Sequence, residues 1–157
     1  METNLPRAFK LVIGQGIGIN HQVLLKGVNN SMKYQGSCHC GAIRFSIDAP
    51  SSVEIEDCNC SICSKAGYLH LILPLSKFTL IQGEENIQTY RYNSGEAKHT
   101  FCRTCGIKPF YTPRSNPDGI DINVRCLETK PESMSVVKFD GEHWEDNAHT
   151  LAHKSKE

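Results

Sequence analysis

Seven of the eight cysteines in this 157-residue chain fall into three tight clusters. The clusters are Cys38/Cys40, Cys58/Cys60/Cys63 and Cys102/Cys105. Cysteine thiolates at such spacings are typical ligands of Zn²⁺, which binds sulfur at about 2.3 Å and favours four ligands in a tetrahedron. The spacing therefore predicts zinc sites, and the number of thiolates in each cluster indicates what each site can do.

The first and third clusters together supply four thiolates. Cys38 and Cys40 are two residues apart, so in an extended chain their side chains would point to one face. Cys102 and Cys105 precede Gly106, which is typical of a knuckle whose tight turn brings two sulfurs to one metal. Four thiolates complete a tetrahedron, so we expect a structural zinc whose binding free energy is part of the folding free energy.

The middle cluster has only three cysteines, Cys58, Cys60 and Cys63. Three protein ligands leave the fourth position of a zinc ion open, which is the arrangement of catalytic sites. A thiol substrate would suit that position because a coordinated thiol is held as a thiolate at neutral pH. We interpret this cluster as the catalytic one.

A fourth protein ligand would instead close the second site. His70 follows the cluster by seven residues, His99 lies near the third cluster, and Cys126 is the one cysteine outside all three. Histidines are more often surface or core residues than ligands. We interpret Cys126 as a small buried residue at the end of a strand.

A chain with eight cysteines is also compatible with a disulfide framework in an oxidising compartment. The first residues, METNLPRAFK, include Glu2 and no long apolar run, so they do not resemble a secretory signal. We therefore expect reduced thiols in the cytoplasm, with the nucleus as the alternative.

The segments that must position these cysteines are short runs rich in β-branched and aromatic residues, separated by turn residues. Residues 42–47, AIRFSI, alternate apolar and polar side chains as a half-buried strand does. We expect an all-β (mainly β) domain with a short helix over about 143–154. The predicted strands are 42–47, 69–73, 77–81, 87–92, 99–102, 108–112, 120–126 and 135–139.

Residues 1–31 differ from the zinc domain that we expect over 32–157. They contain no cysteine, one acidic residue and three basic ones. With a single arginine and a single serine, they lack the composition of an organelle transit peptide. We interpret them as a poorly ordered N-terminal extension, with Met32 as an alternative start.

Charge and hydropathy argue against two classes of partner. Seventeen basic residues balance seventeen acidic ones, so nucleic acid is a weak candidate. The longest apolar runs, such as residues 68–75, are far shorter than the roughly 20 residues that cross a bilayer. No membrane span is expected.

Four sequence segments together resemble the family of glutathione-dependent formaldehyde-activating enzymes, and most closely the branch that includes centromere protein V. The similarity runs from about Tyr34 to Trp144, and its segments are GSCHCGAIRF, DCNCSIC, HTFCRTCGIKPFYTPRSNPDG and RCLE. The resemblance implies an Mss4-like zinc-binding fold of short antiparallel strands with two zinc ions per chain. It places the structural zinc on Cys38, Cys40, Cys102 and Cys105, and the catalytic zinc on Cys58, Cys60 and Cys63.

The resemblance also implies the condensation of glutathione with formaldehyde to S-(hydroxymethyl)glutathione, formally a carbon–sulfur lyase in reverse. We expect a glutathione-type thiol to lose its proton at the second zinc and add to formaldehyde or a related small aldehyde. His70 is the candidate that supplies a proton to the developing alkoxide. Candidates for binding the carboxylates of glutathione are Lys65, Arg103, Lys108, Arg114 and Arg125.

Two other functions remain open at this point. Both zinc ions can be structural in a protein-binding module, which would require a fourth protein ligand at the second site. The Cys58 cluster can also act as a redox sensor, because zinc-bound thiolates can be oxidised. The centromere branch is associated with chromosomes and microtubules, but residues 1–31 do not resemble the long proline-rich and basic N-terminal region of its relevant member.

Overall fold

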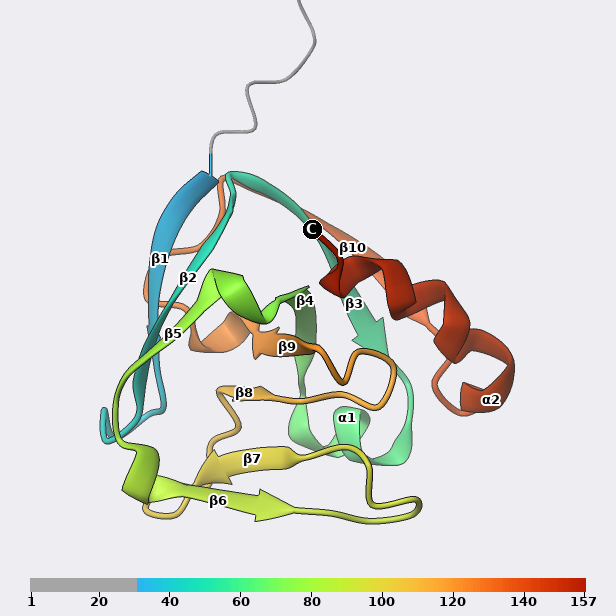
Figure 1. The fold of residues 1–157 in the computed structure, drawn as a ribbon, viewed down its shortest axis with the longest axis horizontal. Helices are drawn as coiled ribbons and strands as arrows, with labels where there is room; N and C mark the ends of the chain where they lie inside the picture. The colour runs from blue at the N-terminus through green and yellow to red at the C-terminus, as the bar shows by residue number, and fades with distance from the viewer. Residues whose placement is uncertain (1–30) are drawn as a thin grey trace, which may run out of the picture.

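Alternating apolar and polar residues build the first sheet of the fold, which the computed structural model describes for residues 31–157 (Figure 1). The sheet has the order β1 (Ser31–Ser37), β2 (Arg44–Pro50) and β5 (Phe78–Gln82), with both pairs antiparallel. Phe45 and Ile47 of β2 are fully buried, whereas Arg44 is exposed. One face of this sheet therefore faces the core.

The second sheet has five strands and carries Cys58 and His70. In spatial order the strands are β10 (Ser133–Phe139), β3 (Ser52–Cys58), β4 (Leu69–Pro74), β9 (Gly119–Asn123) and β8 (Phe110–Tyr111). All neighbouring pairs are antiparallel except β3 and β10, which are parallel. Strand β4 is in the middle, and every residue of its neighbour β9 is buried.

A third sheet is a two-stranded antiparallel pair, β6 (Ile87–Tyr90) and β7 (His99–Cys102). It lies beside β8, which is linked to β7 through the isolated bridge between Lys98 and Thr112 (Figure 1). Cys102 ends β7, so this small sheet brings the third cysteine cluster into the fold.

The helices are few and short. Helix α1 (Ser61–Ala66) begins after Cys60 and ends at Gly67, whose φ of 58° suits a glycine at a helix end. At the C-terminus α2 (Trp144–Asn147) continues into a 3₁₀ helix over Ala148–Ser155, so the predicted C-terminal helix is confirmed. Further 3₁₀ turns cover Leu75–Lys77, Glu84–Asn86 and Val124–Cys126.

Two groups of buried side chains hold the sheets together. In the larger one, the Phe45 ring of β2 contacts Phe110 of β8 with centroids 5.4 Å apart. A side chain at Gly36 would collide with the Phe45 ring, since an added Cβ would lie 2.2 Å from it. The smaller group surrounds the second cysteine cluster with Phe139, Leu151 and Trp144.

The mainly β architecture agrees with the sequence-based prediction, but several boundaries differ. Strands β1 and β3 were not predicted, although Val53 and Ile55 of β3 alternate with acidic residues. The strand predicted over 120–126 ends at Asn123 and continues as a 3₁₀ turn. Strand β8 covers only two of the five residues predicted over 108–112.

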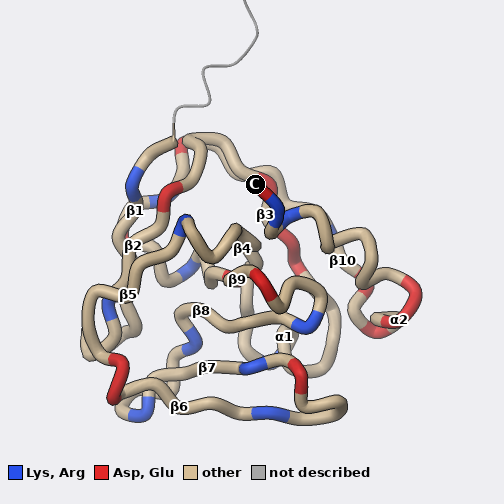
Figure 2. Tube along the Cα trace, in the orientation of Figure 1, with Lys and Arg blue, Asp and Glu red and all other residues tan. Residues whose placement is uncertain are grey.

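The predicted extension over residues 1–31 lies outside the described residues, apart from Ser31. In the described part of the chain, no helix has both the length and the apolar character needed to cross a membrane. Basic and acidic residues are interspersed over most of the fold, whereas acidic residues gather on the segment around α2 (Figure 2).

Candidate metal centres and active site

The first and third cysteine clusters meet in one four-sulfur site. Their Sγ atoms all lie within 4.8 Å of one another. The Sγ atom of Cys40 lies 3.6 Å from that of Cys38 and 3.7 Å from that of Cys102. A tetrahedral zinc with bonds of about 2.3 Å requires sulfurs about 3.8 Å apart. The four thiols, completed by Cys105, therefore have the spacing of a metal site.

Backbone turns produce this spacing. We expected Cys38 and Cys40 on one face of an extended chain, and this is wrong: β1 ends at Ser37. The chain then turns, with the Gly41 N–H donating to the Cys38 carbonyl at 3.1 Å. The Ile43 N–H donates to the Cys38 sulfur at 3.3 Å. In the other knuckle, the Gly106 N–H donates to the Cys102 carbonyl at 2.8 Å.

The second cluster forms where β3 passes into α1. Cys58 is the last residue of β3, Cys60 caps α1 and Cys63 lies inside the helix. The Cys60 N–H donates to the Cys58 sulfur at 3.5 Å. The Ser64 N–H bonds the Cys60 carbonyl at 3.0 Å, which starts the helix. The strand end and the first helical turn thus direct three thiols to one place.

The ionisation of these three thiols is strongly coupled. Hydrogen bonds from Cys58 and Cys63 lower the pKa of the Cys60 thiol to about 2. Donation to Cys60 raises the pKa of Cys58 to about 11, and donation to Cys58 and Cys60 also raises the pKa of Cys63. Among residues 31–157, Cys58 and Cys63 share one potential metal group with His70, and the Cys60 sulfur lies outside that group.

Strand β4 adds a buried histidine to this cluster. His70 pairs with Glu56 of β3, and one of its ring nitrogens lies within 4.8 Å of the sulfurs of Cys58 and Cys63. The His70 Nδ1 atom lies 2.8 Å from Oδ2 of Asp121, and the two side chains are only 4% and 1% exposed. Nε2 is buried without a hydrogen-bond partner.

An unpartnered buried nitrogen is costly, so Nε2 of His70 fits either a metal ligand or a proton-transfer group. A carboxylate on the other ring nitrogen is the usual support of both roles, because it sets the tautomer and the ring orientation. Burial lowers the pKa of His70, but the nearby Asp121 carboxylate outweighs burial and leaves it raised. Asp121 thus holds His70 against the sulfurs.

The other candidate ligands lie elsewhere. His99 stacks between Tyr92 and Tyr111, with ring centroids 5.3 Å and 5.0 Å away. Cys126 lies half-buried in the 3₁₀ turn after β9, not at a strand end, and its sulfur is 3.8 Å from the Lys108 carbonyl. Neither belongs to a potential metal group among residues 31–157.

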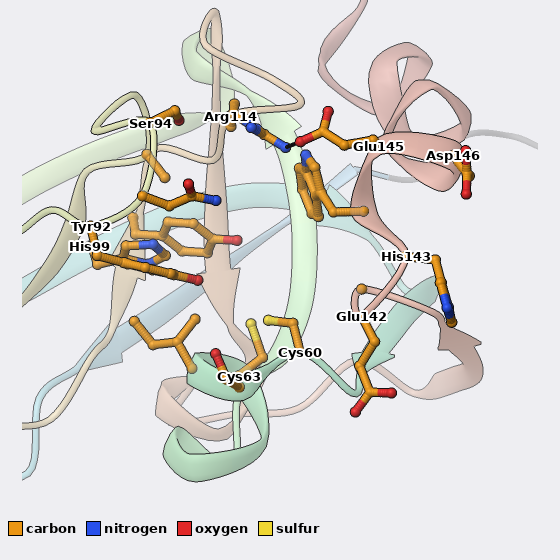
Figure 3. Close-up of a pocket in the computed structure, with 17 residues that line it drawn as sticks. Cys60, Cys63, Tyr92, Ser94, His99, Arg114, Glu142, His143, Glu145 and Asp146 are labelled. Carbon is orange, nitrogen blue, oxygen red and sulfur yellow. Dashed lines mark hydrogen bonds and ion pairs between the residues drawn. The ribbon is translucent and has the colours of Figure 1, made fainter.

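A cavity of about 660 Å³ opens above the second cluster. Cys60 and Cys63 form its base, Tyr92 and His99 one side, and the segment 142–146 the other (Figure 3). A small molecule that enters this cavity reaches the thiols directly.

Only one of the five basic residues predicted to bind substrate carboxylates lines this cavity, namely Arg114. Arg125 lines a second cavity, which also includes Cys58 and Cys63. Lys65, Arg103 and Lys108 line neither cavity.

Sequence reasoning missed three residues that shape the site. Asp121 was included only as part of the strand predicted over 120–126. An acidic residue between the apolar residues of a strand is a signal that could have marked it as functional. Gly141 lies between the strand predicted over 135–139 and the helix predicted over 143–154, and an added Cβ would lie 2.4 Å from the Cys58 sulfur. Asn59 accepts hydrogen bonds from the backbone N–H groups of Gly141 and Glu142 at 2.7 Å and 3.1 Å, which holds this segment over the cluster.

Comparison with known proteins identifies a family. The family model described as "Glutathione-dependent formaldehyde-activating enzyme" matches residues 33–146. A protein of Halomonas elongata named "Putative glutathione-dependent formaldehyde-activating enzyme" is 30% identical over 82 residues, which are 47% of this chain and 52% of that protein. The chain thus spans about half the length of this curated relative.

A solved structure is also similar. The crystal structure of a Rhodobacter sphaeroides protein superposes with a TM-score of 0.58 at 34% sequence identity. The match covers 66% of this chain and 99% of that one. The similarity therefore extends over nearly the whole of the bacterial protein.

Proposed function

The chain belongs to the family of glutathione-dependent formaldehyde-activating enzymes, and from this premise we propose that it adds a glutathione-type thiol to formaldehyde or a related small aldehyde. In the reverse direction the reaction cleaves a carbon–sulfur bond, so the activity is that of a carbon–sulfur lyase. The observation that carries the proposal is that Cys58, Cys63 and the buried His70, which is paired with Asp121, lie together next to a cavity lined by Cys60 and Cys63.

Two groups of residues would bind zinc in this proposal. Cys58, Cys60 and Cys63 would hold the catalytic ion, and the four cysteines of the other site would hold a structural ion. The thiol donors suit zinc, and Gly141 leaves space at the Cys58 sulfur that a larger side chain would fill. Bound at the second site, zinc would keep the sulfur of the substrate ionised at neutral pH.

His70 would move the proton of the reaction. With its Nδ1–H donating to Asp121, the free Nε2 accepts the proton of the substrate thiol. The sulfur then forms a bond to the aldehyde carbon, and the π electron pair of the carbonyl moves to oxygen. Nε2 returns the proton to that oxygen, which yields a hydroxymethyl thioether. The sum is one thiol and one aldehyde giving one product, with no oxidant or reductant.

Walls of the cavity would exclude water from this chemistry. Tyr111 and Trp144 border both the open cavity and the small internal space beside His70. Cys63 also borders both spaces. A substrate sulfur at Cys60 and Cys63 would therefore approach the His70 side of the cluster between two aromatic side chains.

The alternative is a zinc-stabilised protein-binding module without catalysis. One observation favours it: His70 lies close enough to Cys58 and Cys63 to be a fourth ligand, which would close the site. A closed four-ligand zinc site has a structural role.

Exchange NMR on mixed glutathione and formaldehyde tests the proposal, with the uncatalysed background subtracted. We expect acceleration by the wild type, none by Cys60→Ser, and a loss of about 10²-fold or more for His70→Asn. Circular dichroism and zinc content verify that each variant is folded. No acceleration by a wild type with two bound zinc ions would refute the enzymatic proposal and favour the binding module.

We also propose that residues 32–157 form the zinc domain and that the protein works in a reducing compartment, the cytoplasm or the nucleus. The support is that all eight cysteines are free thiols. Thiolate metal sites require reduced cysteines.

A further inference from the structure

The cavity above the second cluster has more acidic than basic side chains. Glu142, Glu145 and Asp146 line it, whereas Arg114 is its only lysine or arginine. Within the part of the chain that the structure describes, Glu142 and Asp146 form no ion pair, and both side chains are exposed. All three acids come from the segment between β10 and the C-terminal 3₁₀ helix (Figure 3).

The positive charge of Arg114 is already compensated. Its Nη2 lies 2.7 Å from Oε1 of Glu145, and its Nε lies 3.9 Å from Oε2 of Glu96. The guanidinium carbon also lies 5.2 Å from the centre of the Trp144 ring. A carboxylate of a substrate would have to displace Glu145 to reach this guanidinium.

The two histidines of the cavity do not offset the acids. Burial lowers the pKa of His99 to about 4, so this residue is neutral at pH 7. His143 lies 2.7 Å from the Asp140 carboxylate, which balances its charge when it is protonated. If the three cysteines hold a divalent ion as thiolates, they would add a net negative charge at the base of the cavity.

The walls offer aromatic faces to a ligand. Tyr92, Tyr111 and Trp144 line the cavity, and Tyr92 stacks on His99 with centroids 5.3 Å apart. Aromatic faces attract organic cations such as quaternary ammonium groups, in addition to burying apolar groups. The aromatic walls and the acidic rim, which consists of Glu142, Glu145 and Asp146, therefore both favour an organic cation.

We propose that this cavity selects thiols that carry a positively charged group, in preference to thiols that carry carboxylates or other anions. The inference rests on the proposed function, because it names the class of thiol used at the same site. Glutathione, with two carboxylates and one ammonium group, would then react measurably but more slowly than a cationic thiol. Clefts lined by one sign of charge change the association of charged ligands by about tenfold or more.

Three small thiols test the inference by exchange NMR with formaldehyde. Thiocholine carries a quaternary ammonium group, 2-mercaptoethanol is neutral and 2-mercaptoethanesulfonate is anionic. None has an amine that reacts with formaldehyde. At low salt we expect the catalysed rate to be about tenfold higher for thiocholine than for the sulfonate, and the difference to shrink at high salt.

Charge variants link this preference to the rim. Glu142→Gln combined with Asp146→Asn should reduce the ratio of the thiocholine rate to the sulfonate rate. The matched control, Glu84→Gln combined with Glu132→Gln, removes two exposed acids outside the cavity and should leave the ratio unchanged.

The outcomes separate this inference from the proposed function. Equal rates for the three thiols, or a faster reaction of the sulfonate, would overturn the charge preference and leave the proposed reaction standing. A preference that the rim and control variants reduce equally would also overturn it. Acceleration of none of the three thiols, nor of glutathione, would overturn the proposed function itself.

Discussion

The two cysteine sites use the same side chain in different surroundings. In the four-cysteine site the sulfurs of Cys40 and Cys102 are 3.7 Å apart although 62 residues separate them in the chain. In the second site, all three cysteines lie in one segment of six residues, and the neighbours are a buried histidine and its carboxylate partner. One site joins distant segments, and the other gathers reactive groups.

This difference has an energetic consequence. A metal that closes a long loop removes much of the entropy of the unfolded chain, whereas one that binds a single short segment removes little. The buried pair of His70 and Asp121 adds nothing to such a closure, yet it is what proton transfer needs. We therefore expect the first site to govern folding and the second to govern chemistry.

The largest expected effect is that of Cys102→Ser. Removing one ligand of the four-cysteine site should release its metal, and we expect the free energy of unfolding to fall by about 5 kcal/mol or more, enough to unfold most of the chain. Thermal unfolding followed by circular dichroism, with zinc content per chain, measures this.

The Cys60→Ser variant is the comparison for Cys102→Ser. It should keep a melting temperature within a few degrees of the wild type, because a metal at the second site closes only a short loop. Equal melting temperatures for the Cys102→Ser variant and the wild type would contradict the folding role of the first site.

An intermediate effect is expected for Gly141→Ala. The added methyl group would lie 2.4 Å from the Cys58 sulfur and 3.0 Å from the Cys60 Cβ, so the segment over the cluster must shift. We expect zinc affinity at the second site to fall by about 10- to 100-fold, as it does when residues around metal ligands are altered. Competition with a chelator measures both sites in one chain, and the four-cysteine site is the control. Unchanged affinity at both sites would show that the close approach of Gly141 is unimportant.

The smallest effect is expected for Cys126→Ala. This cysteine lies in neither potential metal site among residues 31–157 and is half-buried. We therefore expect the free energy of unfolding to fall by about 1 kcal/mol or less and the zinc content to stay unchanged. Chemical denaturation and metal analysis measure the two quantities. A drop in zinc content would mean that the eighth cysteine contributes to a site.

Much of this organisation can be predicted from the sequence because its signals are local. The spacing of Cys102 and Cys105 before a glycine predicts a knuckle, and the alternation around Phe45 predicts a strand. Strand β3 was missed although Val53 and Ile55 alternate with polar residues, because those polar residues are acidic and acidic residues are depleted in strands. The turn at Cys38 was missed because only Gly41, whose φ is 76° in the structure, marks the change of direction.

The sequence by itself determined that the chain has a mainly β fold and seven cysteines in three clusters, at spacings typical of one family. Only the tertiary structure decided which groups meet. The approach of Asp121 to His70 joins residues 51 positions apart through the pairing of β4 with β9. The charge around Arg114 likewise depends on Glu145, 31 positions away. Local spacing fixes the ligand type, but strand register and loop packing set distances between residues far apart in the chain, and these distances determine the chemistry.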